Sequence, residues 1–162
     1  MINRRNIEIE RKYLIDKAPR FASRYKGTMI LQGYIGDGKT ELRLRKYGKR
    51  YFATVKVGKG LKRSEFETEI SKKQFKSLWP AVGRYLKKKR YLIPYRCCGK
   101  KYTIDLDRYY GKLYGLVTAE VEFGSEREAN AFKPPDWFGK DLTGNEAFSN
   151  SMLAKSKRVP KI

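Results

Sequence analysis

The sequence IEIERKY, residues 7–13, decides the fold class of this chain. Charged side chains occupy every second position, at Glu8, Glu10 and Lys12. Successive side chains of a β-strand point to opposite faces, so these three charges share one face. The two carboxylates repel each other unless a cation lies between them. A metal ion bound by Glu8 and Glu10, together with an anion bound by Lys12, would balance all three charges. The alternative is the solvated outer face of an ordinary surface strand.

Similar short alternating runs continue through the chain. Glycine-containing segments at residues 36–38, 48 and 58–60 separate several of them as turns. The number and spacing of the runs favour an antiparallel sheet or barrel over βαβ units. We expect strands near residues 6–14, 28–36, 39–47, 50–58, 63–70, 87–94, 100–108 and 116–123.

Helical segments are expected at a few positions between and after these strands. Serine and aspartate are good N-caps, and proline ends or kinks a helix. We expect a short helix from Asp16 through Tyr25, one that opens at Ser71 and is ended or kinked by Pro80, one capped by Ser125 with Glu128, and a last turn near residues 145–155.

Length and composition indicate one domain, residues 1–162, with a basic and loosely held tail at 155–162. The net charge of +21 favours polyanionic partners: nucleic acid, nucleotides, polyphosphate or an acidic membrane surface. Histidine is absent, which excludes His-based triads, His general bases and His metal ligands. There is no apolar run long enough to span a bilayer. We expect no secretory leader and, with only the adjacent Cys97 and Cys98, a cytoplasmic protein.

Like charges recur on single strand faces in several of the runs. This pattern accounts for 9 of the 17 acidic residues: Glu8, Glu10, Glu65, Glu67, Glu69, Asp105, Asp107, Glu120 and Glu122. Basic residues follow the same spacing at Arg43, Arg45, Lys56, Lys88 and Arg90. An ordinary half-exposed sheet would explain any one strand, but neighbouring like charges are destabilising. We therefore favour a closed barrel with a charged, wet interior and an outward apolar face covered by helices.

The residue types suggest the chemistry of such an interior. Carboxylates without His or Cys suit hard ions such as Mg²⁺ or Mn²⁺. Arginine and lysine bind phosphate oxygens. A site that contains both would bind metal and phosphates together, and phosphoryl transfer needs mainly positioning and charge neutralisation.

The ordered set of motifs resembles the CYTH proteins, also called triphosphate tunnel metalloenzymes. The matching segments are Glu8-Ile9-Glu10-Arg11-Lys12, Gln32-Gly33-Tyr34, Arg43-Leu44-Arg45, Thr54-Val55-Lys56, the run from Glu65 to Ile70, Lys88 to Tyr91, Asp105-Leu106-Asp107, Ala119-Glu120-Val121-Glu122, Pro135-Asp136-Trp137, Thr143-Gly144 and Asn150-Ser151-Met152-Leu153-Ala154. The resemblance implies an α+β, mostly β fold: an eight-stranded antiparallel closed β-barrel with helices packed on the outside.

The resemblance also implies roles for the charged residues. Metal ligands, for Mg²⁺ or Mn²⁺, would be Glu8, Glu10, Asp105, Asp107, Glu120 and Glu122. Substrate phosphates would be bound by Lys12, Arg43, Arg45, Lys56, Lys88 and Arg90, with Glu65 and Glu67 as further tunnel acids beside them. We assign the catalytic role to Lys12, Glu10 and Glu120.

Three functions are compatible with these residues. The first is hydrolysis of a triphosphate, with inorganic tripolyphosphate favoured because the small chain leaves little room for a base-recognition domain. A second is cyclisation of ATP, as in class IV-type adenylate cyclases, or hydrolysis of thiamine triphosphate. The third is a non-catalytic module for RNA or polyphosphate, supported by the excess of basic residues. A nonspecific polyanion partner for the basic surface is compatible with any of them, as is a monomer or a homodimer.

Overall fold

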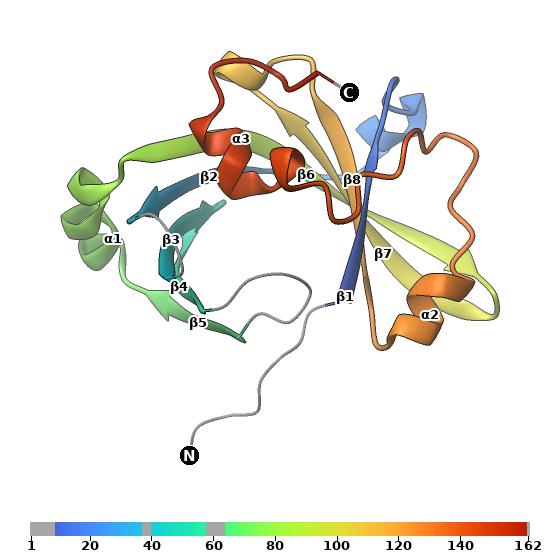
Figure 1. Cartoon of the computed structure of the whole chain (residues 1–162), viewed down its shortest axis with the longest axis horizontal. Coiled ribbons are helices and arrows are strands. Elements are labelled where there is room, and N and C mark those ends of the chain that lie inside the picture. The colour runs from blue at the N-terminus through green and yellow to red at the C-terminus, as the bar shows by residue number, and fades with distance from the viewer. Residues whose placement is uncertain (1–8, 37–39, 58–63, 162) are drawn as a thin grey trace.

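A single antiparallel sheet of eight strands forms the body of the protein (Figure 1). The computed structural model describes residues 9–36, 40–57 and 64–161. The strands lie in the order β1-β8-β7-β6-β2-β3-β4-β5. Their bounds are β1 Ile9–Leu14, β2 Gly27–Ile35, β3 Thr40–Tyr47, β4 Arg50–Val57, β5 Ser64–Ile70, β6 Arg84–Cys97, β7 Lys100–Tyr109 and β8 Val117–Phe123.

The sheet curls into a trough whose two edges are β1 and β5 (Figure 1). Each strand bonds to its neighbours in the order given, and no ladder joins β1 to β5 in the described residues. The expected eight antiparallel strands are therefore confirmed, whereas the closed barrel is not.

The strand β6 is longer than the sequence pattern indicates, at 84–97 instead of 87–94. It continues through Pro94, which cannot donate a backbone hydrogen bond. Pro94 is tolerated because the pairing of β6 with β2 ends at Tyr91, so that β6 has only β7 beside it at this point.

The helices are short and begin largely at the predicted caps. Those at the predicted positions are η1 Arg20–Arg24, α1 Lys72–Leu78, η2 Trp79–Ala81, α2 Glu126–Ala131, η4 Glu146–Phe148 and α3 Asn150–Lys155, and η3 Gly111–Leu113 lies between β7 and β8. Ser71 accepts from the Gln74 N–H at 3.1 Å, and Ser125 accepts from the Glu128 N–H at 3.2 Å. The helix expected from Asp16 is reduced to the 3₁₀ segment η1, which begins after Pro19. Helical backbone is disfavoured for the residue before a proline, so a helix does not run through Ala18.

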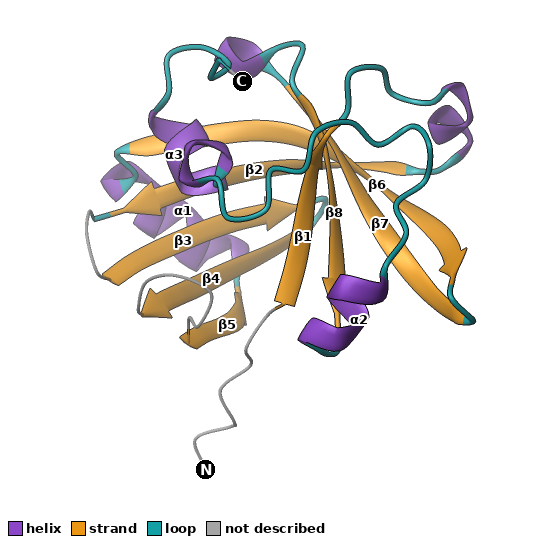
Figure 2. Ribbon diagram, turned by 45° about the vertical axis from the view of Figure 1, so that its right-hand side comes forward, coloured by secondary structure: helices purple, strands orange, loops and turns teal. Residues whose placement is uncertain are grey.

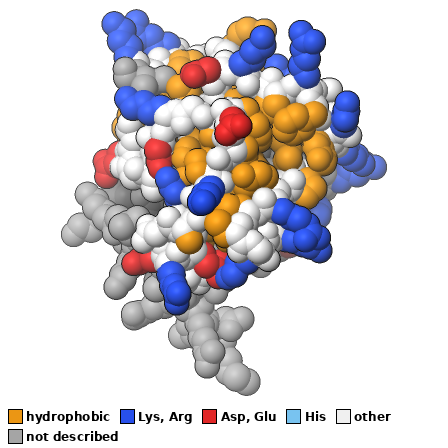
Figure 3. All heavy atoms as spheres, turned by 90° about the vertical axis from the view of Figure 1, so that its right-hand side faces the viewer, with side chains coloured by type: hydrophobic (Ala, Val, Ile, Leu, Met, Phe, Trp, Pro, Cys, Tyr) orange, Lys and Arg blue, Asp and Glu red, His pale blue; other side chains and the backbone are white. Residues whose placement is uncertain are grey.

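One apolar core lies on the outward face of β1, β8, β7 and the distal part of β6. It comprises Tyr13, Ile15, Ala22, Tyr91, Ile93, Cys97, Ile104, Leu106, Ala119, Val121, Phe123, Ala129 and Phe132. Ala129 belongs to α2, so this helix covers the outer face here as expected. Figure 3 shows apolar side chains gathered on this side of the molecule, with lysines and arginines around them.

A second apolar core lies on the inward face, where the sequence pattern indicated only charges. It comprises Tyr34, Leu86, Tyr109, Leu113, Leu116, Leu142, Phe148, Leu153 and Ala154. Leu153 and Ala154 belong to α3, which packs on β6 and β2. Figure 2 shows α3 in front of the sheet and α1 behind it, so the two helices lie on opposite faces. The interior is therefore charged over part of its length only.

Candidate active site

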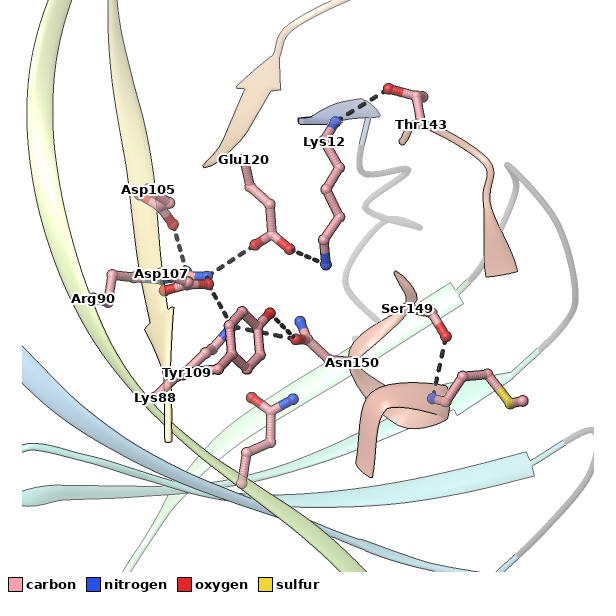
Figure 4. Close-up of polar contacts among 12 residues, drawn as sticks. Lys12, Lys88, Arg90, Asp105, Asp107, Tyr109, Glu120, Thr143, Ser149 and Asn150 are labelled. Atoms are coloured by element: carbon pink, nitrogen blue, oxygen red, sulfur yellow. Dashed lines mark hydrogen bonds and ion pairs between the residues drawn. The ribbon is translucent and has the colours of Figure 1, made fainter. Parts of the chain in front are cut away.

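The register of β1, β8, β7 and β6 brings charged residues from four strands to one face. Lys12 lies opposite Glu120, which in turn lies opposite Asp105. Asp107 lies opposite Arg90 on the next pair of strands. Residues directly opposite each other share a face of the sheet. The close-up in Figure 4 shows their side chains pointing toward one another inside the trough.

Arg90 lies at the centre of this arrangement. Its Nε donates to Asp107 Oδ1 at 2.7 Å, and its Nη2 lies 2.6 Å from Asp107 Oδ2 and 2.8 Å from Glu120 Oε2. Its Nη1 contacts Asp105 as well. Burial alone would lower the pKa of Arg90, but Asp107, Glu120 and Asp105 outweigh it and hold the pKa well above its usual value.

Lys12 forms the second contact of the buried Glu120, with 2.9 Å between Nζ and Oε1. Burial would raise the pKa of Glu120, but Lys12, Lys88 and Arg90 hold it well below the usual range. Burial would lower the pKa of Lys12, but the attraction of Glu120 outweighs it, and the pKa of Lys12 is raised. Both groups are therefore ionised at neutral pH.

Lys88 is the most deeply buried cation of the site, with 1% of its surface exposed. Its Nζ lies 2.6 Å from Asp107 Oδ2. Burial lowers the pKa of Lys88 despite the attraction of Asp107. Asp105 shows the opposite case, because burial raises its pKa to about 6 against the pull of Arg90.

A second charged cluster lies on β3, β4 and β5. Arg43 Nη2 and Arg45 Nη2 lie 3.0 and 2.8 Å from Glu67 Oε2. Thr54 donates to the same oxygen at 2.7 Å. Burial raises the pKa of Glu67, but Arg45, Thr54 and Arg43 together lower it below its usual value.

Arg45 also carries an unsatisfied donor. Its Nε is buried and has no hydrogen-bond partner in the described part of the chain. Burial lowers the pKa of Arg45, and the neighbouring Arg43 lowers it further. A buried N–H without an acceptor is costly. An anion that reached this guanidinium would accept its hydrogen bond and relieve the repulsion between the two arginines.

The predicted metal ligands among the described residues lie on one face but are not gathered around one point; they are Glu10, Asp105, Asp107, Glu120 and Glu122. Glu10 lies directly opposite Glu122 across β1 and β8. Asp105, Asp107 and Glu120 contact arginine or lysine. Within residues 9–36, 40–57 and 64–161, no three carboxylates or cysteines are placed to hold one metal ion. The donor set still suits a hard cation, because it consists of carboxylate oxygens and two of them face each other.

The chain resembles characterised proteins over nearly its full length. It is 41% identical over 155 residues to an inorganic triphosphatase of Nitrosomonas europaea, covering 92% of this chain and 97% of that protein. It is 32% identical to the inorganic triphosphatase of Acetivibrio thermocellus, covering 92% and 94%. No family model matches the chain. The chain belongs to the inorganic triphosphatase family. It is therefore a triphosphatase, a hydrolase of triphosphates.

Two solved structures share the fold of this triphosphatase. The crystal structure of an inorganic triphosphatase matches it with a TM-score of 0.68 and 38% identity, covering 92% of this chain and 95% of that one. An adenylyl cyclase-like protein from Hippeastrum, described as having a dominant triphosphatase activity, matches with a TM-score of 0.55 at 14% identity, covering 76% and 82%, and so shares the fold.

The structure of the triphosphatase places most of the predicted site residues on the inward face. Glu8 and the side chains of Lys56 and Glu65 lie outside the described residues, although the backbone of Lys56 pairs with Glu41 and Glu65. No helix in the described part of the chain is long and apolar enough to cross a membrane.

Two polar residues of the triphosphatase site, Asn150 and Thr54, lie in segments that match the CYTH proteins, but the sequence alone assigned them no role. Asn150 Oδ1 accepts from the Tyr109 hydroxyl at 2.8 Å and lies 3.5 Å from Lys88 Nζ. Thr54 carries the hydroxyl shared with Glu67. Asn150 is on α3 and reaches the site only by tertiary packing, so strand alternation could not reveal it. Thr54 lies two residues before Lys56 in the same strand, and that spacing could have indicated it.

Proposed function

We propose that this triphosphatase acts on inorganic tripolyphosphate, adding water across a phosphoanhydride bond to release phosphate and pyrophosphate. The observation that carries the proposal is the unpartnered Nε of Arg45, buried beside Arg43 on the same face as Lys12, Lys88 and Arg90. The relatives named inorganic triphosphatase support the choice of substrate.

Phosphate binding would use the cations of both clusters, namely Lys12, Arg43, Arg45, Lys56, Lys88 and Arg90. Arginine pairs with two phosphate oxygens at once, and lysine acts as a point charge. A triphosphate is long enough to contact cations from several strands. Its negative charges would replace Glu67 and Glu120, whose carboxylates now occupy Arg45 and Lys12.

A divalent ion, Mg²⁺ or Mn²⁺, would be held by the carboxylates Glu8, Glu10, Asp105, Asp107, Glu120 and Glu122. Such an ion supplies charge neutralisation at the phosphates and lowers the pKa of a bound water. The opposed carboxylates of Glu10 and Glu122 support this assignment. Glu120 would leave its ion pairs, and Lys12 and Arg90 would become available to phosphate oxygens.

The remaining assignments follow the CYTH resemblance and stand as proposals. They are a tunnel closed around the substrate, a cytoplasmic location and a monomer or homodimer. Cyclisation of ATP and hydrolysis of thiamine triphosphate use the same charges, but the relatives of this chain are named inorganic triphosphatase. We therefore favour tripolyphosphate over both.

The test is hydrolysis of tripolyphosphate by Arg45→Ala. Loss of one charged phosphate contact is expected to lower kcat/KM by about 10- to 100-fold. Arg50→Ala is the matched control, because Arg50 is an exposed arginine paired with Glu69 on the neighbouring strand. Unchanged kcat and KM in Arg45→Ala would remove this residue from the substrate site.

A further inference from the structure

The distribution of charge along the chain is uneven in a way that the triphosphatase site does not explain. Residues 70–104 contain eleven lysines and arginines and no aspartate or glutamate. The strand β6 runs through the middle of this segment. Its Lys88 and Arg90 point inward to the site, so Lys87 and Lys89, which alternate with them, lie on the outward face.

The outward cations of neighbouring strands meet at β6. Arg108 of β7 lies directly opposite Lys89. Lys87 lies opposite Leu31 of β2, which lies opposite Lys46 of β3. We call Lys46, Lys87, Lys89 and Arg108 the outer basic strip. Like charges directly opposite each other destabilise a sheet. None of the four contacts a carboxylate within the parts of the chain that the structure describes.

Exposed aromatic and thioether side chains lie among these cations. Tyr85 precedes Lys87 by two residues on the same face of β6 and is 56% exposed. The backbone N–H of Tyr110 donates to the Lys87 carbonyl at 2.9 Å, and Tyr110 is 36% exposed. Met29 lies opposite Lys89 and is 37% exposed. The strip therefore offers flat rings beside its charges.

Basic helices border the strip on two sides. The segment η1, with Arg20 and Arg24, leads into β2 at Gly27, which lies opposite Tyr91, two residues beyond Lys89. The helix α1 packs on β4 through Phe75 and Tyr51, whose rings are 5.0 Å apart, and Tyr51 lies opposite Lys46. The exposed side chains of α1 include three lysines, Lys72, Lys73 and Lys76.

We propose that the outer basic strip binds single-stranded nucleic acid. Such a partner fits both features, because its phosphates pair with lysine and arginine and its bases stack on exposed rings. Inorganic polyphosphate would use the charges but leave the tyrosines without a role. This binding is a second property of the protein, separate from the inward site where tripolyphosphate is hydrolysed.

The experiment measures the affinity of the full-length protein for a fluorescein-labelled oligo(U) of about 16 nucleotides, enough to span one binding surface. Titrations at several salt concentrations between about 50 and 200 mM give the dependence on salt. The charge variant combines Lys87→Ala, Lys89→Ala and Arg108→Ala. We expect weaker binding and a log–log salt slope shallower by up to about 2, because each lost phosphate contact on a single strand removes about 0.7.

The matched control combines Lys157→Ala, Arg158→Ala and Lys161→Ala, which remove the same charge from the exposed tail. It should leave the affinity for oligo(U) nearly unchanged. Both triple variants should hydrolyse tripolyphosphate at the wild-type rate, which also shows that they fold. If a variant does not fold, protection of Lys87 and Lys89 from acetylation by bound oligo(U) in the wild-type protein provides the same test.

Stacking is tested by Tyr85→Leu with Tyr110→Leu. Loss of base stacking is expected to weaken binding by about fivefold to a hundredfold per base, whereas Tyr85→Phe with Tyr110→Phe keeps the rings and the affinity. Three results would overturn the proposal. They are equal affinities for the leucine and phenylalanine pairs, competition by polyphosphate as strong as by unlabelled oligo(U) at equal phosphate concentration, and equal losses in the strip and tail variants.

Discussion

The substitution Glu120→Gln separates the charge of Glu120 from its shape. The buried carboxylate contacts Lys12 Nζ at 2.9 Å and Arg90 Nη2 at 2.8 Å. The amide of glutamine can still accept from one of the two cations, but its NH₂ group must face the other. One charge-assisted hydrogen bond is therefore lost, which costs about 1.5–3 kcal/mol of folding free energy. For a protein of this size that corresponds to a decrease in melting temperature of about 3 to 12 °C.

The catalytic effect of Glu120→Gln should be larger than its effect on stability. If Glu120 is a metal-side carboxylate, we expect kcat/KM for tripolyphosphate to fall by about 100-fold or more, several kcal/mol of transition-state stabilisation. The assay follows phosphate release with Mg²⁺ or Mn²⁺ below the melting temperature of the variant. Glu69→Gln is the control, since it makes the same change at an exposed pair with Arg50. Equal activities and equal melting temperatures for the two variants would refute the reasoning.

Two further predictions test Glu10 as a metal ligand and the ion pair between Asp141 and Arg11 of β1. Glu10→Gln removes a carboxylate opposite Glu122, so Mg²⁺- or Mn²⁺-dependent phosphate release, assayed below the melting temperature of the variant, should fall by roughly 100-fold. Normal turnover would contradict a metal role for Glu10. Asp141 Oδ2 lies 2.6 Å from Arg11 Nη2. Burial would raise the pKa of Asp141, but Arg11 and Thr143 lower this pKa below the usual aspartate value of 3.8. Asp141→Asn should therefore cost up to about 1 kcal/mol of unfolding free energy at neutral pH, a cost limited by solvent screening. This difference should shrink as the pH falls through 3.8 toward the lower pKa that Asp141 has in the folded protein. Urea titrations from pH 3 to 7 measure it, and a constant difference over that range would contradict the ion-pair explanation.

The strands and most of the charged face could be predicted because both depend on alternation of side chains along the chain. Lys12, Asp105 and Glu120 each lie on the inward face, as their spacing predicted, and the register then places them opposite one another. Alternation identifies a shared face but not a distance. It could not show that Arg90 contacts three carboxylates, as opposed to lying apart from them.

The parts that could not be predicted depend on packing between distant segments. Asn150 enters the site because Leu153 and Ala154 of the same helix bury against Leu86 inside the trough. Nothing in the short sequence of α3 identifies the face of the sheet on which it packs. The absence of pairing between the edge strands β1 and β5 in the described residues likewise depends on the curvature of the sheet, which strand patterns alone do not determine.

A substrate panel tests the central claim most directly. Purified protein is assayed with tripolyphosphate, ATP and thiamine triphosphate, each with Mg²⁺, with Mn²⁺ and after treatment with a chelator. Phosphate, pyrophosphate and cyclic AMP are measured separately. We predict metal-dependent release of phosphate and pyrophosphate from tripolyphosphate at the highest kcat/KM, with no cyclic AMP. Formation of cyclic AMP as the main product, or no hydrolysis of any triphosphate with either metal, would contradict the account.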